Sequence, residues 1–389
     1  SGIPFADFLM GTPSSSSFGM MQNPWRVRYW YHQFYIQDDW KVNRRLTLNL
    51  GLRYNLDFPR TAVGNHQSNF DPDALDYIIP APYFSTPRRG TVVHSEVDGV
   101  PRRLAKVDKF NLNPRLGFAY QATSKTVLRG GLGMYNQQFH PYGLNQLFDE
   151  YNTGFNFSSK TGGDPTYWYR LSEGPLPFTY SVNQYGYTPY AGSITGRNVA
   201  WWDRDMKLPY TLNWNFSIQR ELASHLMVET SYSGSSGVRL ISNVNINQIP
   251  VEMTNERVYQ DRQPYKPYVS FGNITYWGNI GHSTYHSGAV KLEKRFSHGL
   301  NFVTHFTFSK AIDNVSGDGF GGRTAYNLDL ERAVSDFDTK RRFVISGGYQ
   351  LPFGPGKHWG GNSRGLIARL IEGYEIHTMG IFQSGPWIT

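Results

Sequence analysis

Apolar and polar residues alternate strictly along much of this chain. In the stretch FYIQDDWKVNRRLTLNLGLRYNLDF, residues 34–58, apolar side chains occupy every second position from Leu46 to Tyr54, and polar residues or glycine fill the positions between them. Successive side chains of a β-strand point to opposite faces, so a period of two predicts a long strand with one apolar and one polar face. Residues 41–44 predict a tight turn to a preceding strand.

Four further segments repeat the pattern as hairpins: residues 115–135, 210–232, 286–310 and 341–385. Together they predict about ten strands. Short turns at residues 41–44, 122–125, 220–225 and 297–299 alternate with long connections at roughly 59–109, 138–207, 241–283 and 313–338. Short turns on one side and long loops on the other are typical of an outer-membrane β-barrel. A soluble sandwich or a propeller is the alternative, but a propeller would show a fixed repeat, and this spacing is irregular.

The choice of fold decides which face points inward. We expect the leucine-rich face to contact lipid, because the opposite face carries mid-strand charges that suit a wide polar lumen. The lumen-facing candidates are Arg53, Arg129, Glu229, Lys291 and Arg295. Aromatic residues near the turns and near the long loops, such as Trp40 and Tyr210, suit two girdles at the membrane interfaces. The fold prediction is an all-β, antiparallel transmembrane barrel with short periplasmic turns and long extracellular loops.

Composition narrows the function classes. The 389 residues have a mean hydropathy of −0.49 and no apolar run of transmembrane-helix length, which excludes a helical membrane protein. The net charge is +8, but the basic residues form no sustained helical stripe, so we do not expect nucleic-acid binding. The chain has no cysteine, which excludes disulfides and thiolate sites.

Several phrases, in order, carry a family resemblance: FYIQDDWKVNRRLTLNLGLRYN, NPRLGFAY, LRGGLGMY, LPYTLNWNFSIQREL, VETSYSGSSGVRL, NFVTHFTFSKAIDN and DTKRRFVISGGYQLPFG. They resemble the barrel of TonB-dependent outer-membrane transporters, in particular the Oar-like branch with a carboxypeptidase-regulatory-like N-terminal domain. The resemblance implies a bacterial outer-membrane location, a 22-stranded barrel and an N-terminal plug that contacts TonB. We expect residues 1–26 to be a lead-in segment and residues 27–389 a partial barrel domain, with the plug and the C-terminal strands outside this chain.

The sequence offers no enzyme-like constellation, and we expect no catalytic residues, cofactor or metal. Gly317, Gly319 and Gly322 match a dinucleotide-binding pattern by letters only, because no βαβ unit surrounds them. An acidic group could hold calcium in a loop, although a solvated acidic surface is the better interpretation: Asp313, Asp318, Asp329 and Glu331. Loop aromatics are the ligand-binding candidates, with simple loop packing as the alternative: Trp168, Tyr169, Trp201, Trp202, Tyr276 and Trp277.

The functional hypothesis is therefore uptake of an unidentified ligand, a carbohydrate or a peptide, by a TonB-dependent transporter. The partners it implies are outer-membrane lipid and lipopolysaccharide, a small ligand or peptide, and the TonB system through an N-terminal region outside this chain. An adhesion or binding barrel and a passive porin are the alternatives, and a soluble sugar-binding enzyme is a remote one. The substrate, the direction of transport and the oligomeric state stay open.

Overall fold

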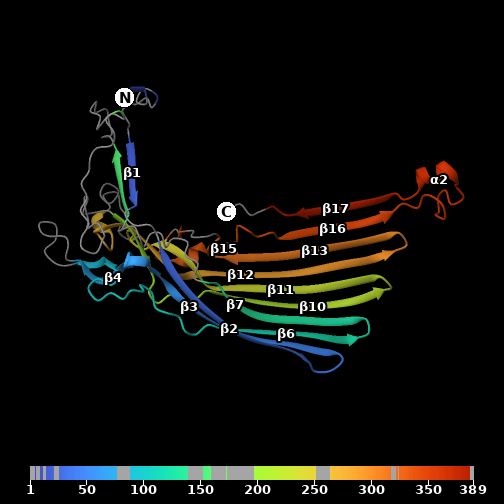
Figure 1. Ribbon diagram of the computed structural model, residues 1–389, viewed down its shortest axis with the longest axis horizontal. Coiled ribbons are helices and arrows are strands. Elements are labelled where there is room, and N and C mark those ends of the chain that lie inside the picture. The colour runs from blue at the N-terminus through green and yellow to red at the C-terminus, as the bar shows by residue number, and fades with distance from the viewer. Residues whose placement is uncertain are drawn as a thin grey trace.

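Ten long strands form one antiparallel sheet (Figure 1). The computed structural model describes residues 5, 9–11, 15–21, 26–76, 88–138, 152–158, 172, 197–250, 263–316, 321–322 and 324–385. From one edge to the other, the strands are β17 (Glu375–Gln383), β16 (Arg341–Gln350), β13 (Leu300–Asp313), β12 (Phe271–Ser297), β11 (Leu226–Asn245), β10 (Tyr210–Ala223), β7 (Thr126–Asn136), β6 (Leu112–Thr123), β3 (Leu46–Ala62) and β2 (Val27–Lys41).

The strand pairing confirms the predicted all-β, antiparallel fold. Each of the five predicted hairpins forms, as β2–β3, β6–β7, β10–β11, β12–β13 and β16–β17. Strands separated by a long connection are also neighbours, so the sheet follows the order of the chain. Within the described residues the sheet is open, with β2 and β17 at its edges. We call the side with the short hairpin turns the turn end and the opposite side the loop end.

Register keeps like side chains together across the sheet. Leu50 lies opposite Leu116, Leu116 opposite Leu132, and Leu132 opposite Trp214. The neighbouring row of paired residues, one position further along each strand, consists of Asn49, Gly117, Gly131 and Asn215. Because the side-chain period is two, this register gives the whole sheet one apolar face and one polar face.

The apolar face is uncharged over long stretches and is open to its surroundings. On this face, each strand from β3 to β17 in the sheet order has at least three uncharged side chains in a row. Examples are every second residue from Leu112 to Tyr120 on β6 and from Phe302 to Phe308 on β13. Leu116 is 52% exposed. A strand needs about 9–11 tilted residues to cross a bilayer, which is close to the Leu112–Tyr120 span.

The apolar stretches are staggered from strand to strand. The row that starts at Leu116, in the middle of the apolar stretch of β6, passes through Gly234 and reaches His286 and Lys310 near the loop end of β13. A membrane band that is level across all strands must therefore cross the hydrogen-bonded rows obliquely. Oblique rows mean tilted strands, which is the geometry that barrel closure requires.

Two glycines let aromatic rings lie flat on the apolar face. Phe118 is the cross-strand partner of Gly130, and Trp214 is the partner of Gly234. A Cβ atom at either glycine would collide with the facing ring. The rings therefore fill the space that a larger partner would occupy, and the face stays smooth.

The loop end carries more regular structure than the sequence predicted. The loop expected at residues 241–283 is shorter, because β11 extends to Asn245 and β12 begins at Phe271. The 59–109 connection contains the hairpin of β4 (Ser68–Asp76) and β5 (Arg88–His94). β9 (Arg197–Trp202) pairs in parallel with β12. β14 (Gly321–Gly322) pairs with β11, and β15 (Ala333–Val334) with β13. Within the expected lead-in, β1 (Ser15–Met21) pairs with β8 (Asn152–Ser158). Apart from the β4–β5 hairpin, these pairings join distant segments, so local periodicity could not reveal them.

Asparagine side chains stabilise this loop end, because their amides form the hydrogen bonds that a neighbouring strand backbone would otherwise form. Asn69 receives a hydrogen bond from the backbone N–H of Trp202 (2.8 Å) and donates one to the carbonyl of the same residue (2.9 Å). Asn279 makes the same pair of bonds with Lys207. The fully buried Asn247 directs its amide group at three carbonyls, those of Tyr268, Phe271 and Gly272. Buried backbone groups are costly without partners, so these amides stabilise the irregular segments.

One turn-end connection is not short. Residues 351–374, between β16 and β17, contain the helix α2 (Gly365–Ile371), which projects beyond the hairpin turns (Figure 1). The four predicted short turns are therefore present, and the fifth hairpin has a longer connection.

Replacing Asn247 tests the role of the asparagine amides. We expect Asn247→Ala to remove the amide that donates to three carbonyls and accepts from the N–H of Tyr268, at a cost of about 1–3 kcal/mol. Hydrogen exchange of residues 268–274 should become faster, while exchange in the central strands stays unchanged. Asn301→Ala, at an exposed asparagine of β13, is the matched control. Equal exchange in both variants would contradict this role.

Candidate functional site

The polar face brings four of the five lumen-facing candidates onto one side of the sheet. Arg53, Arg129, Glu229 and Lys291 occupy alternate positions of β3, β7, β11 and β12 that share this face by register. Arg295 lies in the irregular part of β12 between Lys294 and Ser297, next to the turn. Glu229 and Lys291 are direct cross-strand partners. The Lys291 Nζ also lies 2.8 Å from Oε2 of Glu293. That this face lines a lumen stays a prediction.

Further polar groups extend this cluster into a continuous row. Gln219, Glu229, Lys291 and His305 lie side by side on four neighbouring strands. Arg129 donates a hydrogen bond to Gln219. Acidic, basic and amide groups thus alternate along the row, so it can contact a hydrated solute or a polar protein surface without one dominant sign of charge.

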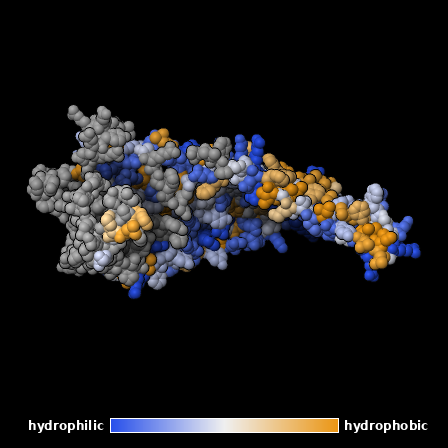
Figure 2. Space-filling model, turned by 90° about the horizontal axis from the view of Figure 1, so that it is seen from above, coloured by the Kyte–Doolittle hydropathy of each residue, from blue (hydrophilic) through white to orange (hydrophobic). Residues whose placement is uncertain are grey.

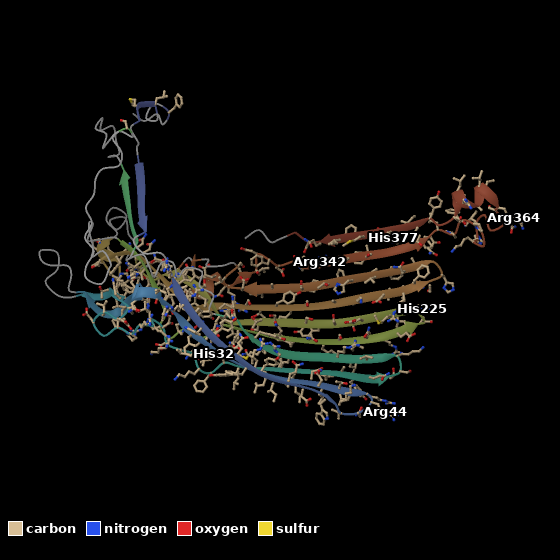
Figure 3. All side chains as sticks on the ribbon, viewed as in Figure 1. His32, Arg44, His225, Arg342, Arg364 and His377 are labelled. Carbon is tan, nitrogen blue, oxygen red and sulfur yellow. The ribbon has the colours of Figure 1, made fainter. Side chains whose placement is uncertain are left out.

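A recess of about 610 Å³ lies at the turn end, between β12, β13, β16 and β17. Glu293, Arg295, Asn301 and His377 contribute polar groups to its lining. Figure 3 shows His377 on the upper strands of the sheet, and the His377 Nε2 lies 3.2 Å from Oε2 of Glu375. Sequence reasoning identified only Arg295 of this group, because the recess depends on the β13–β16–β17 pairing.

At the loop end, the pairing of β9 with β12 brings two aromatic dipeptides side by side. Trp201 lies beside Tyr276 and Trp202 beside Trp277 in the parallel β9–β12 register. The rings of Trp201 and Tyr276 are 4.7 Å apart between centroids, and those of Trp202 and Trp277 are stacked at 5.5 Å. The structure therefore brings together four of the six aromatic ligand candidates.

Burial separates these four aromatics into two kinds. Trp202 and Trp277 are buried and pack with Met206, so their rings serve loop packing. Trp201 and Tyr276 are only half-buried and keep some accessible surface. Trp168 and Tyr169 lie outside the described residues. A ligand contact stays a prediction for this group, and it concerns mainly Trp201 and Tyr276.

A second cluster joins the aromatic pairs to β4. Phe70, Phe271 and Ile274 are fully buried together. Phe70 contacts the rings of Trp201, Tyr268 and Phe271 edge-on, at centroid distances of 6.2, 5.1 and 5.3 Å. We use the name loop layer for the following segments: β4, β5, β9, residues 203–209, residues 241–245 of β11, and residues 271–280 of β12.

Ion pairs fasten the segment after β9 to the rest of the loop layer. Lys106 Nζ lies 2.6 Å from Oδ1 of Asp205, and Arg204 lies 3.5 Å from Asp71. The hydrogen bond from Lys106 holds the pKa of the exposed Asp205 below its usual range. Exposed pairs of this kind contribute little stability. The apolar clusters and the asparagine amides therefore contribute most to holding the loop layer.

Tyr276 has a second role besides its ring contact. Its hydroxyl donates a hydrogen bond to Oδ2 of Asp203 at 2.9 Å. Burial, followed by this bond and the charge of Asp203, raises the pKa of Tyr276 above its usual value. The phenol therefore stays neutral and positions the start of the 203–209 segment.

The remaining sequence candidates do not assemble into a site in the described part of the chain. No group of three histidine or acidic side chains there could hold a metal ion. Asp313 is buried and accepts a bond from Ser316, while Asp329 and Glu331 lie in a short 3-10 turn at Leu328–Glu331. Asp318, Gly317 and Gly319 lie outside the described residues, and Gly322 belongs to β14. No helix among the described residues is long and apolar enough to span a bilayer.

The stacked tryptophans give a direct test of the loop layer. We expect Trp277→Ala to weaken the layer by about 3–5 kcal/mol, because it removes a large buried ring. The circular-dichroism couplet of the stacked indoles should disappear, and the amides of β9 should exchange faster. Trp359→Ala, at an exposed tryptophan of the opposite end, is the control. Retention of the couplet in Trp277→Ala would contradict the assignment.

Comparisons with known proteins agree with this architecture. A family model described as an outer membrane beta barrel domain matches residues 1–389. None of the curated proteins compared with the chain matches it.

Among solved structures, the chain is similar to the outer membrane transporter YddB from Escherichia coli, with 11% identity and a TM-score of 0.39 over 83% of this chain and 40% of YddB. It is also similar to the FrpB iron transporter from Neisseria meningitidis, with 12% identity and a TM-score of 0.41 over 84% of this chain and 32% of FrpB. It is also similar to the alcaligin outer membrane receptor FauA from Bordetella pertussis, with 10% identity and a TM-score of 0.40 over 92% of this chain and 38% of FauA.

The chain thus spans less than half the length of these transporters. The family match covers every residue, and it agrees with the antiparallel sheet. The predicted outer-membrane location is confirmed by the same match. The chain belongs to the outer-membrane β-barrel domain family.

Proposed function

We propose that this chain is part of the barrel wall of a TonB-dependent outer-membrane transporter of the Oar-like branch. The observation that carries the proposal is the staggered, two-faced sheet. The uncharged stretches of its apolar face suit lipid, and its oblique rows suit tilted strands of a closed barrel. The ordered sequence phrases that resemble this branch support the same function.

In the proposed mechanism, the polar face lines the passage. Arg129, Glu229 and Lys291 place both signs of charge along one row, which keeps the wall hydrated without trapping a solute of one charge. Arg53 and Arg295 belong to the same wall. Both edge strands would pair with further strands of a 22-stranded barrel, because unpaired backbone groups are very costly in lipid.

The loop layer is the proposed site of ligand capture on the extracellular side. Its packed interior gives a stable base, and the accessible edges of Trp201 and Tyr276 offer flat surfaces for a carbohydrate or a peptide. Lipid and lipopolysaccharide are the proposed surroundings of the apolar face. The proposed coupling to TonB would run through an N-terminal plug region outside residues 1–389.

Two measurements on the protein isolated from its native outer membrane test the proposal. The first is binding of a purified periplasmic TonB domain to the immobilised protein. The second is potassium chloride conductance in planar bilayers without an energy source. We expect TonB binding and a closed resting state. Steady conductance without TonB binding would instead identify a passive porin, and a closed barrel without TonB binding would identify an adhesion or binding barrel.

A further inference from the structure

The connection between β16 and β17 exposes apolar side chains at the turn end. Leu366, Ile367 and Leu370 of α2 are 81%, 65% and 66% exposed, whereas Ala368 is buried. Trp359, in the same connection, is also exposed. Figure 2 shows hydrophobic surface at this tip of the molecule, next to hydrophilic surface. A seven-residue helix with such a surface needs an apolar environment or a partner to cover it.

The helix is attached to the apolar face of the sheet. The β16–β17 ladder continues past Gln350, because the N–H of Leu351 donates to the carbonyl of Tyr374 at 2.9 Å. By the alternation of the ladder, Leu351 and Tyr374 follow Tyr349 and Ile376 on the apolar face. The Tyr374 hydroxyl donates a hydrogen bond of 2.7 Å to the carbonyl of Leu370. This bond ties the end of α2 to the side of the sheet that faces lipid.

The helix lies at the turn end of the sheet. The N–H of Gln350 donates to the carbonyl of Gly299 in the β12–β13 turn, so β16 ends level with that turn. Arg364, beside α2, lies at the same end of the molecule as Arg44 and His225 in the short turns (Figure 3). The apolar side chains of α2 therefore lie at the turn end of the apolar face.

The charge of the connection complements a phospholipid surface. Residues 351–374 contain three basic side chains, Lys357, Arg364 and Arg369, and one acidic side chain, Glu372, which gives a net charge of +2 with histidine neutral. Arg364 precedes the exposed apolar residues, and Arg369 lies between Ile367 and Leu370. Helices that combine exposed apolar side chains with basic ones bind in the plane of a membrane interface.

We infer that residues 351–374 form a lipid anchor on the periplasmic leaflet of the outer membrane. Leu366, Ile367 and Leu370 enter the boundary of the acyl chains, and Arg364 and Arg369 contact anionic phosphate groups. The inference rests on the apolar face of the sheet contacting lipid. It is independent of what the protein transports and of its coupling to TonB.

Single cysteines carrying an environment-sensitive NBD fluorophore test the anchor, since the chain has no cysteine of its own. The variants are Leu366→Cys on α2, Leu132→Cys on the apolar face, and Arg44→Cys in a short turn as the matched control. Each is made in the protein as isolated from its outer membrane and reconstituted in phosphatidylethanolamine vesicles with phosphatidylglycerol. Doxyl-labelled lipid quenches from the acyl region, and iodide quenches from water.

We expect doxyl lipid to remove most of the fluorescence at Leu366 and Leu132, and iodide to remove most of it at Arg44. Omitting phosphatidylglycerol should reduce lipid quenching at Leu366 only, and Arg364→Gln with Arg369→Gln should abolish that dependence. Leu370→Cys provides a second site on α2 if Leu366→Cys fails to fold, as judged by heat-modifiable electrophoretic mobility.

Three outcomes would overturn the anchor. Lipid quenching at Leu132 with only iodide quenching at Leu366 would place α2 in water while leaving the sheet in the membrane. Quenching at Leu366 by neither reagent would mean that protein covers the helix. Iodide quenching at Leu132 would remove the lipid-facing sheet on which the inference depends.

Discussion

Backbone hydrogen bonding in a medium without water is the constraint on which this structure depends. A strand that crosses hydrocarbon must satisfy each N–H and C=O group within the protein. The ladder does this for the strands between β2 and β17, and its register simultaneously places the apolar side chains on one face. The two requirements reinforce each other, because a register shift of one residue would move the leucines of β3 to the polar face.

The same constraint acts differently at the two ends of the sheet. At the loop end, irregular segments leave the regular ladder, and side-chain amides such as that of Asn69 replace the missing backbone partners. Apolar clusters around Phe70 and Trp277 then supply the burial that these segments need to stay folded. At the turn end, four connections are so short that they leave few groups unpaired. The fifth contains α2, whose exposed apolar side chains we infer to contact lipid.

The sequence was informative wherever structure is local. Alternation from Leu46 to Tyr54 was sufficient to predict a two-faced strand, and the same period located the other four hairpins. It also placed Glu229 and Lys291 on one face, although their direct pairing requires the register. The β9–β12 pairing was beyond such reasoning, because Trp202 and Trp277 are distant in the chain and parallel pairing has no local signal. Their burial was likewise invisible, so exposed and buried loop aromatics could not be separated.

The central claim is that this sheet has one lipid-facing side and one polar side. Spin labels at successive positions 213–219 of β10, in the protein reconstituted in its membrane, test it most directly. Oxygen concentrates in lipid, and a nickel chelate stays in water. We expect high oxygen accessibility at Trp214, Phe216 and Ile218 and low oxygen accessibility at the positions between them. A uniform profile, or high oxygen accessibility at Asn213, Asn215 and Ser217 instead, would contradict it.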